Sequence, residues 1–281
     1  MRDLDALTSS TLKHLREHWW NEAFTGFLEE TLRPRPGNTI LDVGCGTGTA
    51  EIGLARLRVS QLRLVGVDLV PARVVSAAGA SRGMNARVHY ASADACHLPF
   101  PDGTFDSTFC VAVLQHIRDI GGAVAELARV TRPGGRVLAV EPDNAARYWY
   151  SSEESGMHAA ELGRRFFAGL AAARGEPPAS AVGPLIPGAF GAHGIEPAAV
   201  NLFPVSVAHL GAPPAVLWES RRAAIGDAIH KAPGESLRRL GLDFQKAVEQ
   251  YARDAEKAGA SFVEIQNTML FATVGTVQDP A

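Results

Sequence analysis

The chain has 281 residues, which is enough for one large domain or for a domain with a cap, and its formal net charge is -3. Its basic residues are spread along the chain rather than clustered, which argues against a nucleic-acid partner. No apolar run is long enough to span a bilayer, and the three cysteines form no C-x-x-C pair, which argues against a metal site. We therefore expect a cytoplasmic protein with reduced thiols and no membrane span.

The first part of the chain is predicted to be helical. A helical segment over residues 4–32 ends at Pro34, Pro36 and Gly37, which are typical of a stop and a linker. Residues 1–36 are therefore expected to form an N-terminal helical cap.

The middle of the chain has the pattern of an α/β protein. Strands and helices alternate over residues 40–140, which predicts a doubly wound, mostly parallel sheet with its core at residues 37–144. After this core the pattern changes, and residues 145–281 are expected to hold the rest of the sheet with a helical lid. The expected elements there are helices at 151–173 and 214–258 and strands at 198–207 and 268–277, with the lid insertions at 145–180 and 208–260.

The most informative feature is the turn that follows the first predicted strand. Gly44, Gly46 and Gly48 let the backbone turn sharply and approach a ligand without Cβ atoms in the way. A helix-like segment comes next, so the turn is expected to present free amides and a positive helix end to a carboxylate or a phosphate. A dinucleotide site would have its third glycine at position 49, which is Thr49. The spacing therefore argues against NAD.

Acidic residues follow the next two predicted strands. Asp68 stands at the end of the second strand, where a carboxylate accepts hydrogen bonds from the hydroxyls of a ribose. Asp94 follows the third strand, and it could accept from an adenine amino group while the amide of Ala95 donates to a ring nitrogen. A fourth apolar run then leads to His116, and a fifth strand ends at Glu141. These features together indicate a ligand with a ribose and an adenine.

In this order, five motifs resemble those of the class I S-adenosylmethionine-dependent methyltransferases, and among them the small-molecule group of the ubiquinone and menaquinone C-methyltransferases. The resemblance is close over residues 40–143 and loose on both flanks. It implies a Rossmann-like sheet of seven strands, with S-adenosylmethionine as the methyl donor and S-adenosylhomocysteine as the product. The motifs lie at residues 41–48, 66–68, 93–100, 105–116 and 132–135.

The resemblance also implies a role for each cofactor residue. The three glycines of the turn contact the methionine part, Asp42 holds it directly or through water, and the backbone of Val111 or Ala112 receives its amino group. Asp68 takes the ribose hydroxyls and Leu69 packs against the adenine. Asp94 and Ala95 then read the adenine edge.

The methyl acceptor is expected above the carboxyl ends of the strands, where open α/β sheets bind their ligands. Aromatic residues are few in this chain, but several fall in the segments that flank the core, which favours a small apolar or aromatic acceptor. The alternative is that these side chains form the lid's own core. The candidate acceptor contacts are Trp19, Trp20, His116, Tyr148 and Trp149.

Two residues are candidates for catalysis. His116 lies after the fourth strand at the ligand end and could act as a general base, or it could only hold its loop. Glu141 is the second candidate, and its alternative role is to cap the following turn. Three functions stay open: methyl transfer, a cyclisation or rearrangement on the same fold, and a non-catalytic cofactor-binding subunit. A homodimer also stays open.

Overall fold

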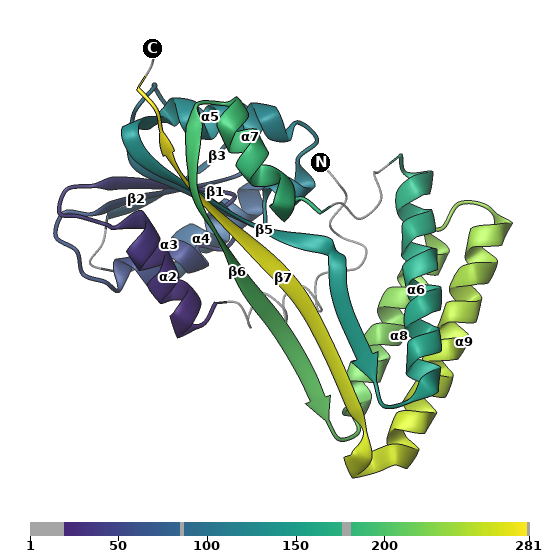
Figure 1. Cartoon of the computed structure of the whole chain (residues 1–281). Coiled ribbons are helices and arrows are strands. Elements are labelled where there is room, and N and C mark those ends of the chain that lie inside the picture. The colour runs from purple at the N-terminus through teal and green to yellow at the C-terminus, as the bar shows by residue number, and fades with distance from the viewer. Residues whose placement is uncertain (1–19, 85–86, 176–180, 280–281) are drawn as a thin grey trace.

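The computed structural model describes residues 20–84, 87–175 and 181–279. Their strands form one seven-stranded sheet in the order β3-β2-β1-β4-β5-β7-β6 (Figure 1). Neighbouring strands are parallel from β3 to β5, and β7 runs antiparallel to both β5 and β6. The predicted doubly wound, mostly parallel sheet is therefore confirmed.

From the first strand to α5 (Ile120–Val130) the chain follows the sequence expectation closely. Of the helix expected over residues 4–32, the structure has residues 22–32 as helix, and residues 4–19 lie outside the described ranges. Two of the chain's helices begin at side chains that satisfy free backbone amides: Asn21 accepts from the Phe24 amide at 2.9 Å, and Asp119 accepts from the Gly122 amide at 2.8 Å. The helices are α2 (Glu22–Leu32), α3 (Thr49–Ala55), α4 (Pro71–Ala80) and α5 (Ile120–Val130). The strands are β1 (Thr39–Val43), β2 (Arg63–Asp68), β3 (Arg87–Ser92) and β4 (Phe105–Val111).

The second half differs from the expectation because its strands are much longer than predicted. The fifth strand, expected at residues 137–141, continues through Tyr148–Ser151, where its backbone pairs with Glu264–Asn267 of the last strand. The first few residues of both expected lid insertions are therefore strand. The strands are β5 (Thr131–Ser151), β6 (Ile195–Leu210) and β7 (Val263–Val277). The helices are α6 (Glu154–Ala173), α7 (Ile186–Ala192), α8 (Ala215–His230) and α9 (Glu235–Ala258).

The extended ends of β5, β6 and β7 form a ribbon that projects from the sheet and carries α6, α8 and α9 at its far end (Figure 1). The parallel strands end together, because Val43 pairs with Val67 and Val111 pairs with Val140. Since β5 runs on past this edge, the helical bundle lies beyond the carboxyl ends of the strands. The two predicted insertions thus meet in one bundle. Within the described ranges, no helix is long and apolar enough to cross a membrane.

A buried ion pair ties the bundle to the ribbon. Glu264 of β7 is 0% exposed, and Arg221 of α8 donates to both of its carboxylate oxygens. Tyr251 of α9 donates to the same carboxylate at 2.7 Å. Burial opposes ionisation of Glu264, but the hydrogen bonds and the charge of Arg221 lower its pKa below the ordinary value. Glu264 is therefore a charged anchor for two helices.

We expect Arg221→Ala to lower the free energy of unfolding by roughly 3–5 kcal/mol, because it leaves a buried carboxylate without its cation. Urea unfolding followed by circular dichroism measures this. The control is Arg239→Ala, which removes an exposed ion pair with Glu235 in the same bundle and is expected to cost about 1 kcal/mol or less. Equal losses in the two variants would contradict the anchoring role.

Candidate functional site

The strand register gathers the predicted cofactor residues at one edge of the sheet. Asp42 and Asp68 lie at the ends of the adjacent strands β1 and β2, and Val111 ends the neighbouring β4. Glu141 follows Val140, which pairs with Val111. Side chains from four strands therefore meet where open α/β sheets bind their ligands.

The glycine turn takes a backbone shape that other residues adopt only with strain. Gly44, Gly46 and Gly48 have φ values of 81, 56 and 84°. A Cβ atom at Gly44 would overlap the side chain of Val113, which lies directly against the turn. The glycines thus let this corner lie close to the loop after β4.

The expectation of free amides in this turn is wrong for four of its residues. The amides of Gly44 and Cys45 both donate to the Val67 carbonyl, at 2.7 and 2.9 Å. Gly46 donates to Asp68 Oδ2 at 3.0 Å, and Gly48 donates to the Cys45 carbonyl at 3.0 Å. The sharp turn brings these donors within reach of β2, so the protein itself satisfies them. The glycines therefore provide close approach rather than an anion-binding row of amides.

Asp68 connects the glycine turn to the next loop. Its side chain is 5% exposed, and besides Gly46 it accepts from the Val70 amide at 2.9 Å. Arg73 lies 3.8 Å from Oδ1. Between these polar contacts Leu69 is 50% exposed, which is unusual for a leucine at the end of a buried strand. An apolar surface thus stands beside a carboxylate with a fixed orientation.

Glu51, in the first turn of α3, lies under the glycine turn and was missed by the sequence reasoning. It is 1% exposed, and its charge acts on the buried carboxyl of Asp42. Burial, assisted by the neighbouring carboxyls, raises the pKa of Asp42 well above its ordinary value, and burial raises the pKa of Glu51 to about 7. The only sequence signal was an acidic residue within an otherwise apolar and small helix.

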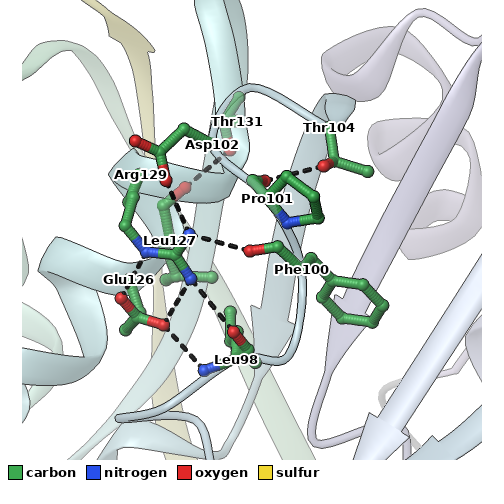
Figure 2. Close-up of polar contacts among 9 residues, drawn as sticks. All are labelled: Leu98, Phe100, Pro101, Asp102, Thr104, Glu126, Leu127, Arg129 and Thr131. Carbon is green, nitrogen blue, oxygen red and sulfur yellow. Dashed lines mark hydrogen bonds and ion pairs between the residues drawn. The ribbon is translucent and has the colours of Figure 1, made fainter.

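The loop from β3 to β4 is fixed by one arginine on α5 (Figure 2). Arg129 donates to the carbonyls of Leu98 and Phe100 at 3.0 and 2.8 Å and pairs with Asp102 at 2.7 Å. Glu126 receives two further hydrogen bonds from Arg129 and also accepts from the Leu98 amide at 2.7 Å. This network holds the segment that follows the predicted adenine residues.

The predicted adenine residues begin that loop. Asp94 is exposed and turns the chain locally, because its side chain accepts from the Cys96 amide at 2.9 Å and its carbonyl accepts from the His97 amide at 2.9 Å. Ala95 is half-buried between them. Both residues lie one strand away from Asp68, because Asp68 pairs with Ser92 in the sheet.

The loop after β4 is strained at its first residue. Ala112 has a φ of 57°, a left-handed conformation that costs free energy for a residue other than glycine. Its amide donates to the Val140 carbonyl at 2.8 Å, so the sheet holds this conformation in place. Such outliers cluster at functional sites, and this one redirects the chain just after Val111.

Glu141, the second candidate for catalysis, lies beneath this loop. It is 0% exposed, and its carboxylate accepts from the amides of Val113, Leu114 and Gln115 at 2.8, 2.8 and 3.2 Å. Burial raises the pKa of Glu141 to about 7, although the three hydrogen bonds act to lower it. These contacts match the alternative expected from the sequence, in which Glu141 caps the turn that follows the strand. Glu141 thereby sets the position of the loop that leads to His116.

His116 ends this loop at the ligand edge. It is half-buried, it belongs to a short 3-10 helix at Leu114–His116, and its amide donates to the Val113 carbonyl at 2.9 Å. The geometry is compatible with either of the roles expected from the sequence.

Two of the aromatic candidates pack against other aromatic rings of the protein. Trp20 packs edge-on against Phe24 with ring centroids 5.2 Å apart, and Trp149 packs against Tyr251 of the bundle at 5.8 Å. These contacts favour the alternative that the aromatic side chains pack within the protein's own core, and the acceptor contacts at Trp20 and Trp149 stay predictions. Tyr148 is 57% exposed, and Trp19 lies outside the described residues.

Comparison with known proteins finds a protein family that matches part of this chain. Residues 41–139 match the family described as Methyltransferase domain. The methyltransferase GfsG of Streptomyces halstedii is 36% identical over 120 residues, which are 43% of this chain and 43% of GfsG. The demethylmenaquinone methyltransferase of Mycolicibacterium gilvum is 35% identical over 135 residues, 48% of this chain and 54% of that protein. The match spans about half the length of these relatives.

Solved structures are similar over nearly the whole chain. The YcgJ protein of Bacillus subtilis has a TM-score of 0.57 and 18% identity, with 92% of this chain and 100% of that chain covered. The [4+2]-cyclase SpnF has a TM-score of 0.53 and 19% identity, with 95% and 93% covered. At these identities the likeness shows the fold alone. Over residues 41–139, the chain is therefore similar to methyltransferase domains, and its fold is that of the solved structures it resembles.

Proposed function

We propose that this chain binds S-adenosylmethionine at the carboxyl edge of β1, β2, β3 and β4 and transfers its methyl group to a small acceptor. The observation that carries this proposal is the oriented Asp68 carboxylate between the glycine turn and exposed Leu69. A ribose has two neighbouring hydroxyls for such a carboxylate, and an adenine has an apolar face for such a leucine. The match to methyltransferase domains supports the same donor.

The remaining cofactor roles follow the order of the strands. Asp42 is the partner proposed for the ammonium group of the methionine part, together with the Val111 carbonyl. Gly44, Gly46 and Gly48 give the methionine part room beside the backbone. Asp94 and the Ala95 amide are the proposed partners of the adenine edge.

Methyl transfer requires positioning more than proton chemistry, because the sulfonium already activates the methyl group. Aligning an acceptor with the S–CH₃ bond supplies roughly 7–11 kcal/mol of the barrier. The loop fixed by Glu141 and Ala112 is the proposed surface for that alignment, since it lies between the glycine turn and the start of the ribbon. An apolar surrounding favours the reaction because attack disperses the sulfonium charge.

His116 is the proposed base where the acceptor must lose a proton. We expect His116→Ala to lower kcat by about 100-fold and to leave the Kd of S-adenosylhomocysteine within twofold, since general-base catalysis contributes roughly 10²–10⁴-fold. Steady-state kinetics and calorimetry measure the two quantities. His89→Ala, a change at an imidazole on β3, is the matched control. An unchanged kcat for His116→Ala would remove this residue from the mechanism.

The acceptor class proposed is a small apolar or aromatic metabolite of specialised or quinone metabolism. The relative named as a demethylmenaquinone methyltransferase supports this proposal. The similar fold of a [4+2]-cyclase makes cyclisation the second candidate reaction. Incubating candidate acceptors with methyl-labelled S-adenosylmethionine and analysing the products by mass spectrometry separates the two. We expect a gain of one labelled methyl group. A rearranged product of unchanged mass would support cyclisation instead.

A further inference from the structure

One face of the ribbon formed by β5, β6 and β7 is covered by the protein's own helices. On this face Trp149 of β5 packs against Tyr251 of α9, with ring centroids 5.8 Å apart. Nearer the sheet, Phe203 of β6 packs against Phe24 of α2 at 5.7 Å. Successive residues of a strand point to opposite faces, so the residues next to Trp149 and Phe203 along their strands lie on the other face.

That opposite face, which we call the ribbon face, is largely open to solvent. It consists of Tyr148 and Tyr150 of β5, every second residue of β6 from Val200 to Leu210, and the residues of β7 that pair with these. Tyr148 and Leu210 are 57% and 80% exposed, and Leu202 is 52% exposed. Of the eleven large apolar side chains that are exposed in the described ranges, five lie on this face. Such a contiguous apolar patch on a soluble protein marks an interaction site.

The ribbon face is large enough to contribute to a stable protein interface. Residues 200–210 of β6 span roughly 35 Å, and two to three strands spaced about 4.8 Å apart give a width of roughly 10–15 Å. The face therefore measures on the order of 350–500 Å². A stable interface buries roughly 800 Å² on each partner, so this face supplies about half of one partner's share.

The charge of the ribbon face fits a second copy of this chain. At the base of the ribbon Asp143 is buried, and among the described side chains of the ribbon face itself none is charged. Two such faces can meet without burying an unpaired charge, which is costly in an interface. A two-fold axis brings the same surface of each copy together. The face is therefore complementary to itself.

Two other arrangements fit the structure less well. Pairing through the free edge of β6 needs a continuous row of backbone amides, and Pro197 and Pro204 interrupt that row. Residues 1–19, which lie outside the described ranges, join the structure at Trp20. Trp20 packs against Phe24, which lies on the covered face of the ribbon. The N-terminal segment thus enters on the side away from the ribbon face.

We propose that this chain forms a symmetric dimer in which the ribbon faces of two copies pack against each other. The inference does not depend on the proposed reaction, because no residue of the ribbon face has a role in the proposed donor site.

Sedimentation equilibrium of the full chain tests this inference. We expect a monomer–dimer equilibrium over protein concentrations of about 1–100 µM, with the dimer predominant at the upper end. Raising the salt concentration is expected to change the dissociation constant of the dimer by less than about twofold, because salt screens charge pairs and this interface has none. A monomer at every concentration, as when residues 1–19 or a different protein cover the face, would overturn the inference.

Substitutions on the ribbon face locate the interface. Leu202→Arg places one added charge from each copy in the same interface, so we expect the dissociation constant of the dimer to rise by about 100-fold or more. Ser206→Arg adds the same charge at an exposed polar position of the face and removes no apolar side chain from the monomer. Circular dichroism shows whether each variant folds as the wild type does.

Leu242→Arg is the matched control, because it makes the same change at a leucine of α9 that is 48% exposed and lies outside the ribbon. We expect this variant to dimerise as the wild type does. Dimers of undiminished strength in both ribbon variants would show that the copies associate through another surface and would overturn the inference.

Discussion

Asp68→Asn is expected to weaken the binding of S-adenosylhomocysteine by about 100-fold or more. The substitution keeps the size of the side chain but removes its charge and turns one acceptor oxygen into a donor. Asp68 accepts from the Gly46 and Val70 amides, and in the proposed complex it also accepts from the ribose. Hydrogen bonds to a charged group contribute roughly 1.5–3 kcal/mol each, so losing two of them accounts for the expected effect.

Isothermal titration calorimetry measures the loss, and thermal unfolding without ligand separates it from a folding defect. Asp243→Asn is the matched control, because it makes the same change at an exposed position of α9. We expect this control to bind as tightly as the wild type. If Asp68→Asn kept its affinity within threefold, the ribose assignment would be wrong.

Glu141→Ala is expected to lower the free energy of unfolding by about 3–5 kcal/mol. The substitution leaves the amides of Val113, Leu114 and Gln115 without their acceptor in a buried place. Each unsatisfied buried amide costs roughly 1–3 kcal/mol, and water entering the cavity would offset part of that cost. Since the same loop leads to His116, turnover is expected to fall as well.

Urea unfolding gives the stability change, and amide hydrogen exchange at residues 113–115 locates it. Protection of these amides is expected to fall far more than protection of residues in β1. Glu126→Ala is a useful comparison, because this carboxylate accepts only one backbone amide, from Leu98, and is less deeply buried. A loss for Glu141→Ala no greater than that of Glu126→Ala would contradict the role given to Glu141.

The core of the fold was predictable because the sequence patterns that indicate it are local. The glycine turn, the acidic ends of β2 and β3 and the apolar strands each occupy a few consecutive residues, and their order alone predicts the parallel sheet. The helix expected over residues 214–258 is broken at Gly234, whose φ of 74° ends the continuity between α8 and α9. A proline and a glycine at that point were the available signal.

The ribbon was not predictable in the same way, because it depends on pairing between distant segments. Pro142 marks a break in the sequence pattern, yet β5 continues beyond it because β7 supplies a partner more than a hundred residues later. The antiparallel partner cannot be read from residues 143–151 themselves. The expected lid therefore began too early in the chain.

The site residues show the same difference between local sequence patterns and contacts that only the fold creates. Asp68 and the three glycines could be proposed from the sequence because their spacing along the chain is itself the signal. The burial of Glu141 and its three amide donors come from the folded loop and could not be predicted from the sequence. The same holds for the aromatic contacts of Trp20 and Trp149, and Glu51 was missed because only folding brings it near Asp42. Tertiary contacts decided each case.

The most direct test of the proposed donor site is equilibrium dialysis with methyl-labelled S-adenosylmethionine. We expect one saturable site per chain, with label displaced by S-adenosylhomocysteine and not by NAD, because Thr49 stands where a dinucleotide site has its third glycine. The absence of saturable binding, or displacement by NAD at similar concentrations, would contradict the assignment of this edge of the sheet to S-adenosylmethionine.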